Sequence, residues 1–224
     1  PLTREQWLAM SRPAQWLHRL FFTLPGMGFY YTLGVWWPHI ICLSQDQLAQ
    51  LRSVRRHRIE LSLLAIFLGL QICVVATVGA WRDGGATARL SEVILLVVWP
   101  FCIWHWTMAF VTLQHHMHPR VRWFDNAVDW SYFNAQVSGT VHMVFPSIVE
   151  NGFLRIFDHT AHHADKAIPL YRLPESQAAL EAEYPESVIV QRASLGHLRD
   201  VLTRCRLYDY RHHRWMDFDG RYTT

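Results

Sequence analysis

The sequence predicts an all-α, multi-pass membrane protein, made of a transmembrane hairpin, interfacial helices and a cytoplasmic helical cap. Hydrophobic residues make up 51% of the 224 residues and gather in long runs without charge. A soluble helix or strand would instead alternate them with polar residues. A second unusual feature is the count of fourteen His, which calls for a chemical explanation.

Two uncharged runs, at residues 61–81 and 93–113, are predicted to cross the membrane. A helix of that length is roughly 30 Å long, about the thickness of the hydrocarbon core. Pro100 interrupts the second run, but proline is tolerated inside membrane helices. A short polar turn at residues 82–86 joins the runs into a hairpin.

Arginines gather outside the two ends of this hairpin, which sets its predicted orientation. The outer ends carry Arg52, Arg55, Arg56, Arg58, Arg120 and Arg122, whereas the region between the runs has Arg82 and Arg89, offset by Asp83. Because basic loops stay on the cytoplasmic side, both outer ends are expected in the cytoplasm. Residues 114–224 are therefore predicted to form a cytoplasmic cap and tail.

Residues 20–43 form a third apolar segment, and it allows two interpretations. The segment is long enough to span, but it contains two prolines and three glycines, and basic residues flank both sides. A single span would place one basic flank outside. An interfacial or re-entrant segment is favoured, with Trp36 and Trp37 at headgroup level, and a true span is the alternative.

Charge and cysteine usage exclude other classes of protein. The net charge is +3, and the arginines form no continuous basic stripe, so no nucleic-acid partner is expected. The four Cys show no C-x-x-C spacing, so neither a disulfide framework nor a zinc knuckle is indicated. The chain begins at Pro1 without a signal peptide, and an N-terminal part is expected to be missing.

The segment at residues 158–163 contains the strongest candidate for a metal site. His159, His162 and His163 are spaced i, i+3 and i+4, which places them on one face of a helix. Three imidazoles on one face can converge on a metal, and imidazole suits Fe, Zn, Cu and Ni alike. The alternative is a set of solvated histidines on a surface helix. Asp158 either orients an imidazole or is a solvated acid.

A second histidine cluster follows the second apolar run. It comprises Gln114, His115, His116 and His118, with His118 and then His115 favoured as ligands. The alternative is a polar cap of a helix C-terminus, where a protonated imidazole is favoured by the dipole. Two histidine clusters on the same membrane face are what a shared metal site requires.

The other histidines are weaker candidates. His105 lies ten residues before His115, roughly 15 Å along a helix, which is too far to share the centre. It is predicted to pack or to line a substrate channel. His142 is a possible second-shell residue or ligand. The remaining six are predicted to be surface or interfacial: His18, His39, His57, His197, His212 and His213.

The order of these motifs resembles the membrane fatty acid desaturases, especially the bacterial and plastid acyl-lipid type, which are omega-6-like. The resemblance rests on L-Q-H-H-M-H-P after a span, D-H-T-A-H-H, I-P-L-Y-R-L and the C-terminal C-R-L-Y-D-Y-R-H-H-R-W-M-D-F-D-G. It covers nearly the whole chain from about residue 51. His159, His162 and His163 match the family's third histidine box, and the run from His115 to His118 matches an additional histidine element.

The resemblance implies a chemistry and a set of partners. Two irons held by imidazoles activate O₂ and insert a double bond into a fatty acyl chain that is linked to a lipid, to a carrier or to CoA. Ferredoxin or a cytochrome b-type protein donates the electrons, and the protein is embedded in membrane lipid. The first two histidine boxes are absent from residues 1–113, so this chain is expected to be a C-terminal portion that is inactive alone.

Two other functions compete with desaturation. Hydroxylases and ketolases use the same scaffold, and histidine spacing separates them poorly from desaturases. A non-catalytic membrane protein that binds or moves a metal ion would need polar ligands through both spans. Only Gln71 and His105 lie there.

Overall fold

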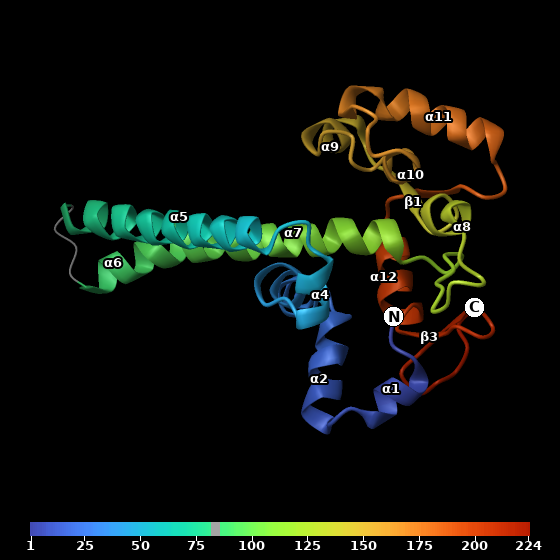
Figure 1. Cartoon of the computed structure of the whole chain (residues 1–224), viewed down its shortest axis with the longest axis horizontal. Coiled ribbons are helices and arrows are strands. Elements are labelled where there is room, and N and C mark those ends of the chain that lie inside the picture. Colours follow the sequence, from blue (N-terminus) through green and yellow to red (C-terminus); the bar gives the residue numbers. More distant parts are fainter. Residues whose placement is uncertain (82–85) are drawn as a thin grey trace. The chain divides into compact units, whose positions relative to one another are not determined.

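The computed structural model describes residues 1–81 and 86–224, and it is mostly helical, as the sequence predicts (Figure 1). Four short strands accompany the helices, which the all-α prediction did not include. The chain forms two compact units: Leu24–Ala109, and Pro1–Thr23 together with Phe110–Thr224. The predicted polar turn at 82–86 lies outside the described residues, except for Ala86.

The first unit is dominated by the hairpin. One arm is α5 (Val54–Trp81), and the other begins with α6 (Ala86–Val93) and η2 (Ile94–Val98) and continues into α7 (Trp99–His116). α5 packs against α6 and η2. Both predicted spans, 61–81 and 93–113, lie within these helices.

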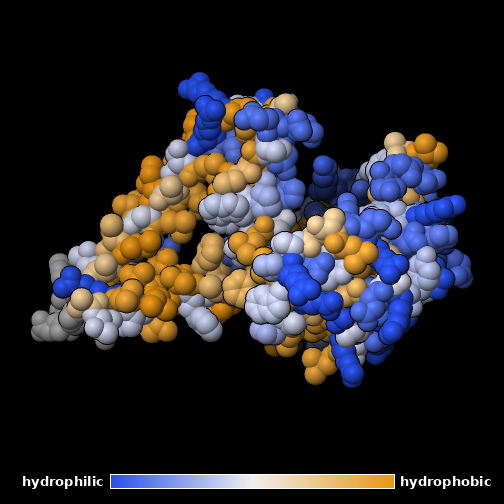
Figure 2. Space-filling model, turned by 90° about the horizontal axis from the view of Figure 1, so that it is seen from below, coloured by the Kyte–Doolittle hydropathy of each residue, from blue (hydrophilic) through white to orange (hydrophobic). Residues whose placement is uncertain are grey.

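Two stretches of the described chain, Val54–Val78 and Arg89–His116, are long and apolar enough to cross a membrane. In the most apolar 18 residues of each stretch, 0% of the residues are buried in the first stretch and 11% in the second. Figure 2 shows the hydrophobic side chains gathered along this hairpin. Apolar surface that extensive is unfavourable in water and is suited to contact with lipid.

The apolar segment at 20–43 is largely helical. It contains α3 (Met27–Tyr30) and a π-helix, η1 (Tyr31–Ile41), and is followed by α4 (Gln45–Gln50). The Trp106 side chain donates to the Leu24 carbonyl at 2.8 Å. A Cβ on Gly28 would lie 3.2 Å from the Trp106 Cα, so glycine permits this close approach to α7. An interfacial or re-entrant position of this segment stays a prediction.

In the second unit, the N-terminal residues dock on the C-terminal tail. The helices α1 (Arg4–Ala9) and α2 (Arg12–Phe21) precede the hairpin unit, and the strands β3 (Leu207–Asp209) and β4 (Arg214–Met216) pair antiparallel in the tail. Trp7 is 2% exposed and packs with Leu207, Met216 and Phe218. The first and last segments of the chain therefore share one hydrophobic core.

The rest of this unit surrounds a two-stranded parallel sheet. β1 (Val141–Val144) pairs with β2 (Ile189–Arg192), with Val141 opposite Ile189. The short helix α10 (His159–Ala164) contacts β1 and two further helices, α8 (Tyr132–Gln136) and α11 (Leu173–Glu183). The remaining elements are α9 (Ser147–Gly152), η3 (Leu170–Arg172) and α12 (Leu195–Arg204).

The docking of the N-terminal segment is tested by replacing Trp7 with alanine. Because the indole is buried against Phe218, W7A should lower the free energy of unfolding by about 3–5 kcal/mol. W16A is the matched control, since Trp16 is 67% exposed, and it should change stability by less than about 0.5 kcal/mol. Denaturant unfolding in detergent measures both, and equal effects would contradict the packing described.

Candidate metal centre

The C-terminal end of α7 delivers one set of imidazoles. The helix is mostly apolar as far as Leu113, with His105 inside it, and it ends with Gln114, His115 and His116. Gln114 and His115 are 2% and 1% exposed. The last turn of this apolar helix is therefore lined with buried polar side chains.

The second set of imidazoles lies on α10. This helix is six residues long, and Asp158 is its N-cap residue. His159, Thr160 and Ala161 are buried, while His162 and His163 are partly exposed. The i and i+4 positions of His159 and His163 place both imidazoles on the face toward α7.

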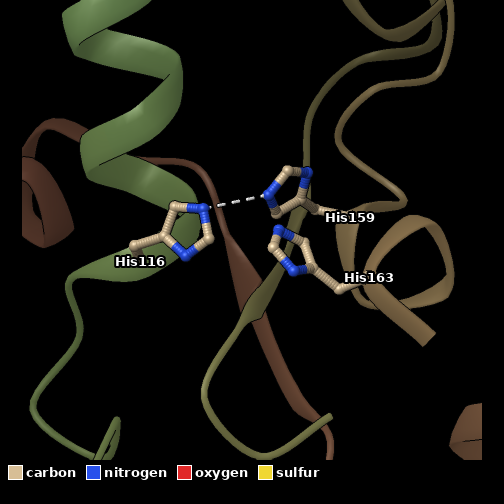
Figure 3. Close-up of side chains that lie close together, drawn as sticks. All are labelled: His116, His159 and His163. Atoms are coloured by element: carbon tan, nitrogen blue, oxygen red, sulfur yellow. Dashed lines mark hydrogen bonds between the residues drawn. The ribbon is translucent and has the colours of Figure 1, made fainter. Parts of the chain in front are cut away.

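The two sets converge, as Figure 3 shows for His116, His159 and His163. The Nε2 atoms of His116 and His159 are 3.2 Å apart, and one ligand atom of each of the three residues lies within 4.8 Å of the others. Two nitrogens bound at roughly 2.1 Å to one metal are about 3.0–3.4 Å apart. The His116–His159 separation therefore fits two ligands of one ion.

His115 completes a cluster of four imidazoles. Its ring stacks on that of His159, with centroids 3.8 Å apart and an interplanar angle of 17°. The His115 Nε2 and His159 Nδ1 atoms are buried and have no hydrogen-bond partner among the described residues. Unpaired buried nitrogens are costly unless something binds them. This donor set of imidazoles suits iron, and it also suits Zn, Cu and Ni.

Gln136 orients one of these imidazoles. Its Oε1 lies 2.6 Å from the His163 Nδ1, so the ring donates its Nδ1–H there and presents Nε2 to the cluster. The Tyr132 hydroxyl donates to the carbonyls of His163 and Ala164, each at 3.0 Å. α8 thus supports the C-terminal end of α10.

Burial favours the neutral form of two imidazoles of α10, those of His159 and His163. Desolvation, reinforced by His115 and His116, holds the pKa of His159 far below its ordinary value. Desolvation also lowers the pKa of His163, and the neighbouring His162 adds to this effect. Only a neutral imidazole has a lone pair to give to a metal, so the site is prepared for binding at neutral pH.

Two of the predicted ligands lie beside the cluster. His118 packs against His197 of α12, with ring centroids 5.4 Å apart, and its Nδ1 accepts a hydrogen bond from the Arg120 amide at 3.0 Å. Burial and His197 lower the pKa of His118 to about 4. The His162 ring centroid is 5.7 Å from that of His159 and 5.9 Å from that of His163. Gln114, predicted either to support a ligand or to bind the metal itself, has a buried Oε1 without a hydrogen-bond partner among the described residues.

His142 and Asp158 belong to a network of ion pairs behind α10. The His142 Nε2 is 3.3 Å from Asp158 Oδ1, and its Nδ1 is 2.5 Å from Glu181 Oε1. Both ring nitrogens of His142 therefore face carboxylates. Asp158 also accepts from Arg155 at 3.0 Å, and burial raises the pKa of Asp158, an effect that Arg155 partly opposes.

Two hollows reach the cluster from the surface of this unit. A 430 Å³ cavity is lined by His116 and His163 together with Arg122, Trp123 and Trp130. A 300 Å³ cavity is lined by His162, His163, Tyr132, Gln136 and Lys166. His163 lines both cavities, so solvent-borne molecules have a route to it.

The sequence analysis did not single out Gln136, Gln177 or Glu181, which support the cluster from α8 and α11. No motif contains them, and they lie far in sequence from the residues that they contact. Gln136 is 27 residues from His163, Gln177 is 16 from Ala161, and Glu181 is 39 from His142. A partial signal existed in the Gln177 and Glu181 spacing of i, i+4, which places both on one helix face.

Site and fold together define a helical protein with an apolar hairpin and a histidine cluster where the second arm ends. No family model matches the chain. It is 28% identical to the sn-1 oleoyl-lipid 12-desaturase of Synechocystis sp. over 183 residues, which cover 79% of the chain and 49% of the relative. The Arabidopsis thaliana chloroplastic omega-6 fatty acid desaturase is 24% identical over 172 residues, which cover 77% of the chain and 36% of that relative.

A third relative, the chloroplastic omega-6 fatty acid desaturase of Spinacia oleracea, is 30% identical over 110 residues, which cover 49% of the chain and 24% of that protein. These relatives place the chain in the membrane fatty acid desaturase family. The predicted family is confirmed. The chain spans between about a quarter and a half of the length of these three relatives.

The support from Gln136 predicts a loss of metal affinity in Q136L. Without the acceptor for its Nδ1–H, His163 is free to turn, and Co²⁺ should bind about 10- to 100-fold more weakly. Q47L is the matched control, because Gln47 bonds the Nδ1 of His39 at 2.6 Å on an exposed part of the chain. Titration of the purified protein with Co²⁺, followed by absorption, measures both variants. Equal affinities for Q136L and wild type would contradict the orienting contact.

The lowered pKa values of His159 and His163 predict a weak pH dependence of metal binding. Two histidines with an ordinary pKa near 6.5 would cost on the order of tenfold in affinity between pH 7.5 and pH 6.0, because protons compete with the metal. Since the pKa values of both groups are lowered, protons compete less with the metal over that window, and the Co²⁺ affinity should fall by clearly less than tenfold. A tenfold fall or more would show that these imidazoles are exposed to protonation.

Proposed function

We propose that the protein is an acyl-lipid desaturase that introduces a second double bond into an oleoyl chain at a histidine-ligated di-iron centre. The convergence of His116, His159 and His163 carries this proposal. Two of the relatives are named as 12- and omega-6 desaturases, and the first acts on oleoyl lipid by its name. Because the chain spans at most about half of these relatives, the activity is proposed for a protein of full family length.

His115, His116, His159 and His163 are proposed to hold iron, with His118 and His162 as further ligands. Bound iron, with O₂, supplies an oxidant that can remove hydrogen from an unactivated alkyl chain, which no side chain can do. Two irons need more imidazoles than the four that converge here. We therefore propose that this chain supplies only part of the ligand set and is inactive alone.

Residues of this chain orient the metal-binding imidazoles, keep them available and line the proposed path of the acyl chain. Gln136 holds the His163 ring with Nε2 toward the cluster, and the stacked His115 and His159 rings keep each other in place. Burial favours the neutral, metal-binding form of His159 and His163. α7 is mostly apolar before its last turn, with His105 as the ionisable exception, so an acyl chain that follows this helix would be led to the histidines.

The proposed partners follow from the reaction and from the apolar hairpin. Desaturation needs two electrons from outside, which ferredoxin or a cytochrome b-type protein would supply. The acyl chain would be esterified to a membrane lipid, as the name of the cyanobacterial relative states for that protein. The hairpin would be embedded in the bilayer, with the histidine-bearing unit on the cytoplasmic side.

Lipid analysis of cells that express the protein at full family length tests the reaction. In a host whose lipids contain oleoyl chains, dienoic acyl chains should appear. H159A should lower their amount by at least roughly 100-fold, because a ligand is lost. H212A is the control, since His212 pairs with Asp209 on the exposed tail. A new hydroxyl or keto group in place of the double bond would move the assignment to a hydroxylase or ketolase. The absence of any modified acyl chain would contradict the proposed reaction.

A further inference from the structure

α11 carries two polar side chains that reach the back of the histidine helix. Gln177 is 1% exposed, and Glu181 follows it by one turn on the same face. The Gln177 amide donates to Glu181 Oε1 at 2.9 Å, so the two side chains form one unit. A polar group as deeply buried as Gln177 needs its hydrogen-bond partners, which makes its contacts specific, whereas the Glu181 side chain is 31% exposed.

Glu181 acts on the N-terminal end of α10 through one intermediary. It accepts from His142 at 2.5 Å, and the other nitrogen of that ring is 3.3 Å from Asp158. Asp158 directly precedes His159 in the chain and is the N-cap residue of α10. The imidazole of His142, which lies on β1, is thus a bridge between two carboxylates on two elements.

Gln177 acts directly on the first turn of α10. Its Oε1 accepts from the Ala161 amide at 2.9 Å, and this amide is one of those that a helix cannot satisfy internally. An N-cap side chain normally serves this purpose. The Asp158 side chain makes no such capping bond, because it faces His142 and Arg155 instead. Gln177 therefore supplies from another helix the cap that Asp158 does not.

We infer that Glu181 and Gln177 are positioning residues, which fix the helix that carries His159 and His163 by holding its N-terminal end at two points. This inference rests on the proposed metal centre. One contact reaches the Ala161 amide and the other the Asp158 side chain, both at the N-terminal end of α10, so they set where its imidazoles stand relative to His116. Ligands of one ion tolerate displacements of only a few tenths of an ångström, so loss of either contact weakens binding.

Co²⁺ titration of the purified 224-residue protein tests this role. E181L and Q177L should each bind Co²⁺ at least tenfold more weakly than wild type, while E181Q, which keeps an oxygen acceptor, should lose less. The double variant H142L/E181L should bind within about threefold of the weaker single variant, because both act through one chain of contacts. E175L is the matched control on the same helix, since Glu175 pairs with Arg172 on the surface, and it should bind within about twofold of wild type.

The outcomes separate this role from others. Wild-type affinity in E181L or Q177L, with Co²⁺ bound normally by the wild type, overturns the positioning role and leaves the metal centre standing. Additive losses in the double variant also overturn it. Should E181L unfold, H142L decides, because it removes the bridge between Glu181 and Asp158: affinity equal to wild type overturns the role. The metal centre itself fails if the wild type binds no Co²⁺, or if H116A binds Co²⁺ as tightly as the wild type does. In either case the positioning role fails with it.

Discussion

The close approach of imidazoles from two helices is the constraint on which the rest of this unit depends. His115 and His116 come from the end of a long apolar helix, whereas His159 and His163 come from a helix of only six residues. A helix that short has little stability of its own. Its position must therefore be imposed by neighbouring elements, and α8, β1 and α11 all contact it.

Burial makes the site costly without a metal and favourable with one. Four imidazoles within one cluster cannot all be protonated, because their charges would repel one another at short range. Neutral imidazoles in turn leave the His115 Nε2 and His159 Nδ1 buried without partners among the described residues. A cation bound between the converging Nε2 atoms of His116 and His159 would accept their lone pairs, so binding and local stability are coupled.

Local patterns predicted the parts of the fold that depend on neighbouring residues. Uncharged length identified both arms of the hairpin, and the i, i+3, i+4 spacing identified α10 as a histidine helix. The contacts between distant residues were not predictable in this way. The strand β1 pairs with β2, which lies nearly fifty residues later, and a run of four residues gives too weak a periodic signal for either strand.

The choice among adjacent histidines likewise depended on tertiary structure. The sequence favoured His118 and then His115, but successive helical residues point about 100° apart, and only the position of α10 selects among them. In the structure the Nε2 atoms of His116 and His159 lie 3.2 Å apart, His115 stacks on His159, and His118 lies against α12. Gln136, Gln177 and Glu181 belong to no motif, and only the folded chain brings them to the site.

X-ray absorption at the iron edge of the Fe²⁺-loaded protein tests the central claim most directly, because it reports the atoms bound to the metal. If His116, His159 and His163 bind iron, the spectrum will show nitrogen neighbours at roughly 2.0–2.2 Å, together with the outer-shell scattering of imidazole rings. This ring scattering will fall in H116A. A spectrum with oxygen neighbours alone, or one that H116A leaves unchanged, would contradict a metal centre built from these histidines.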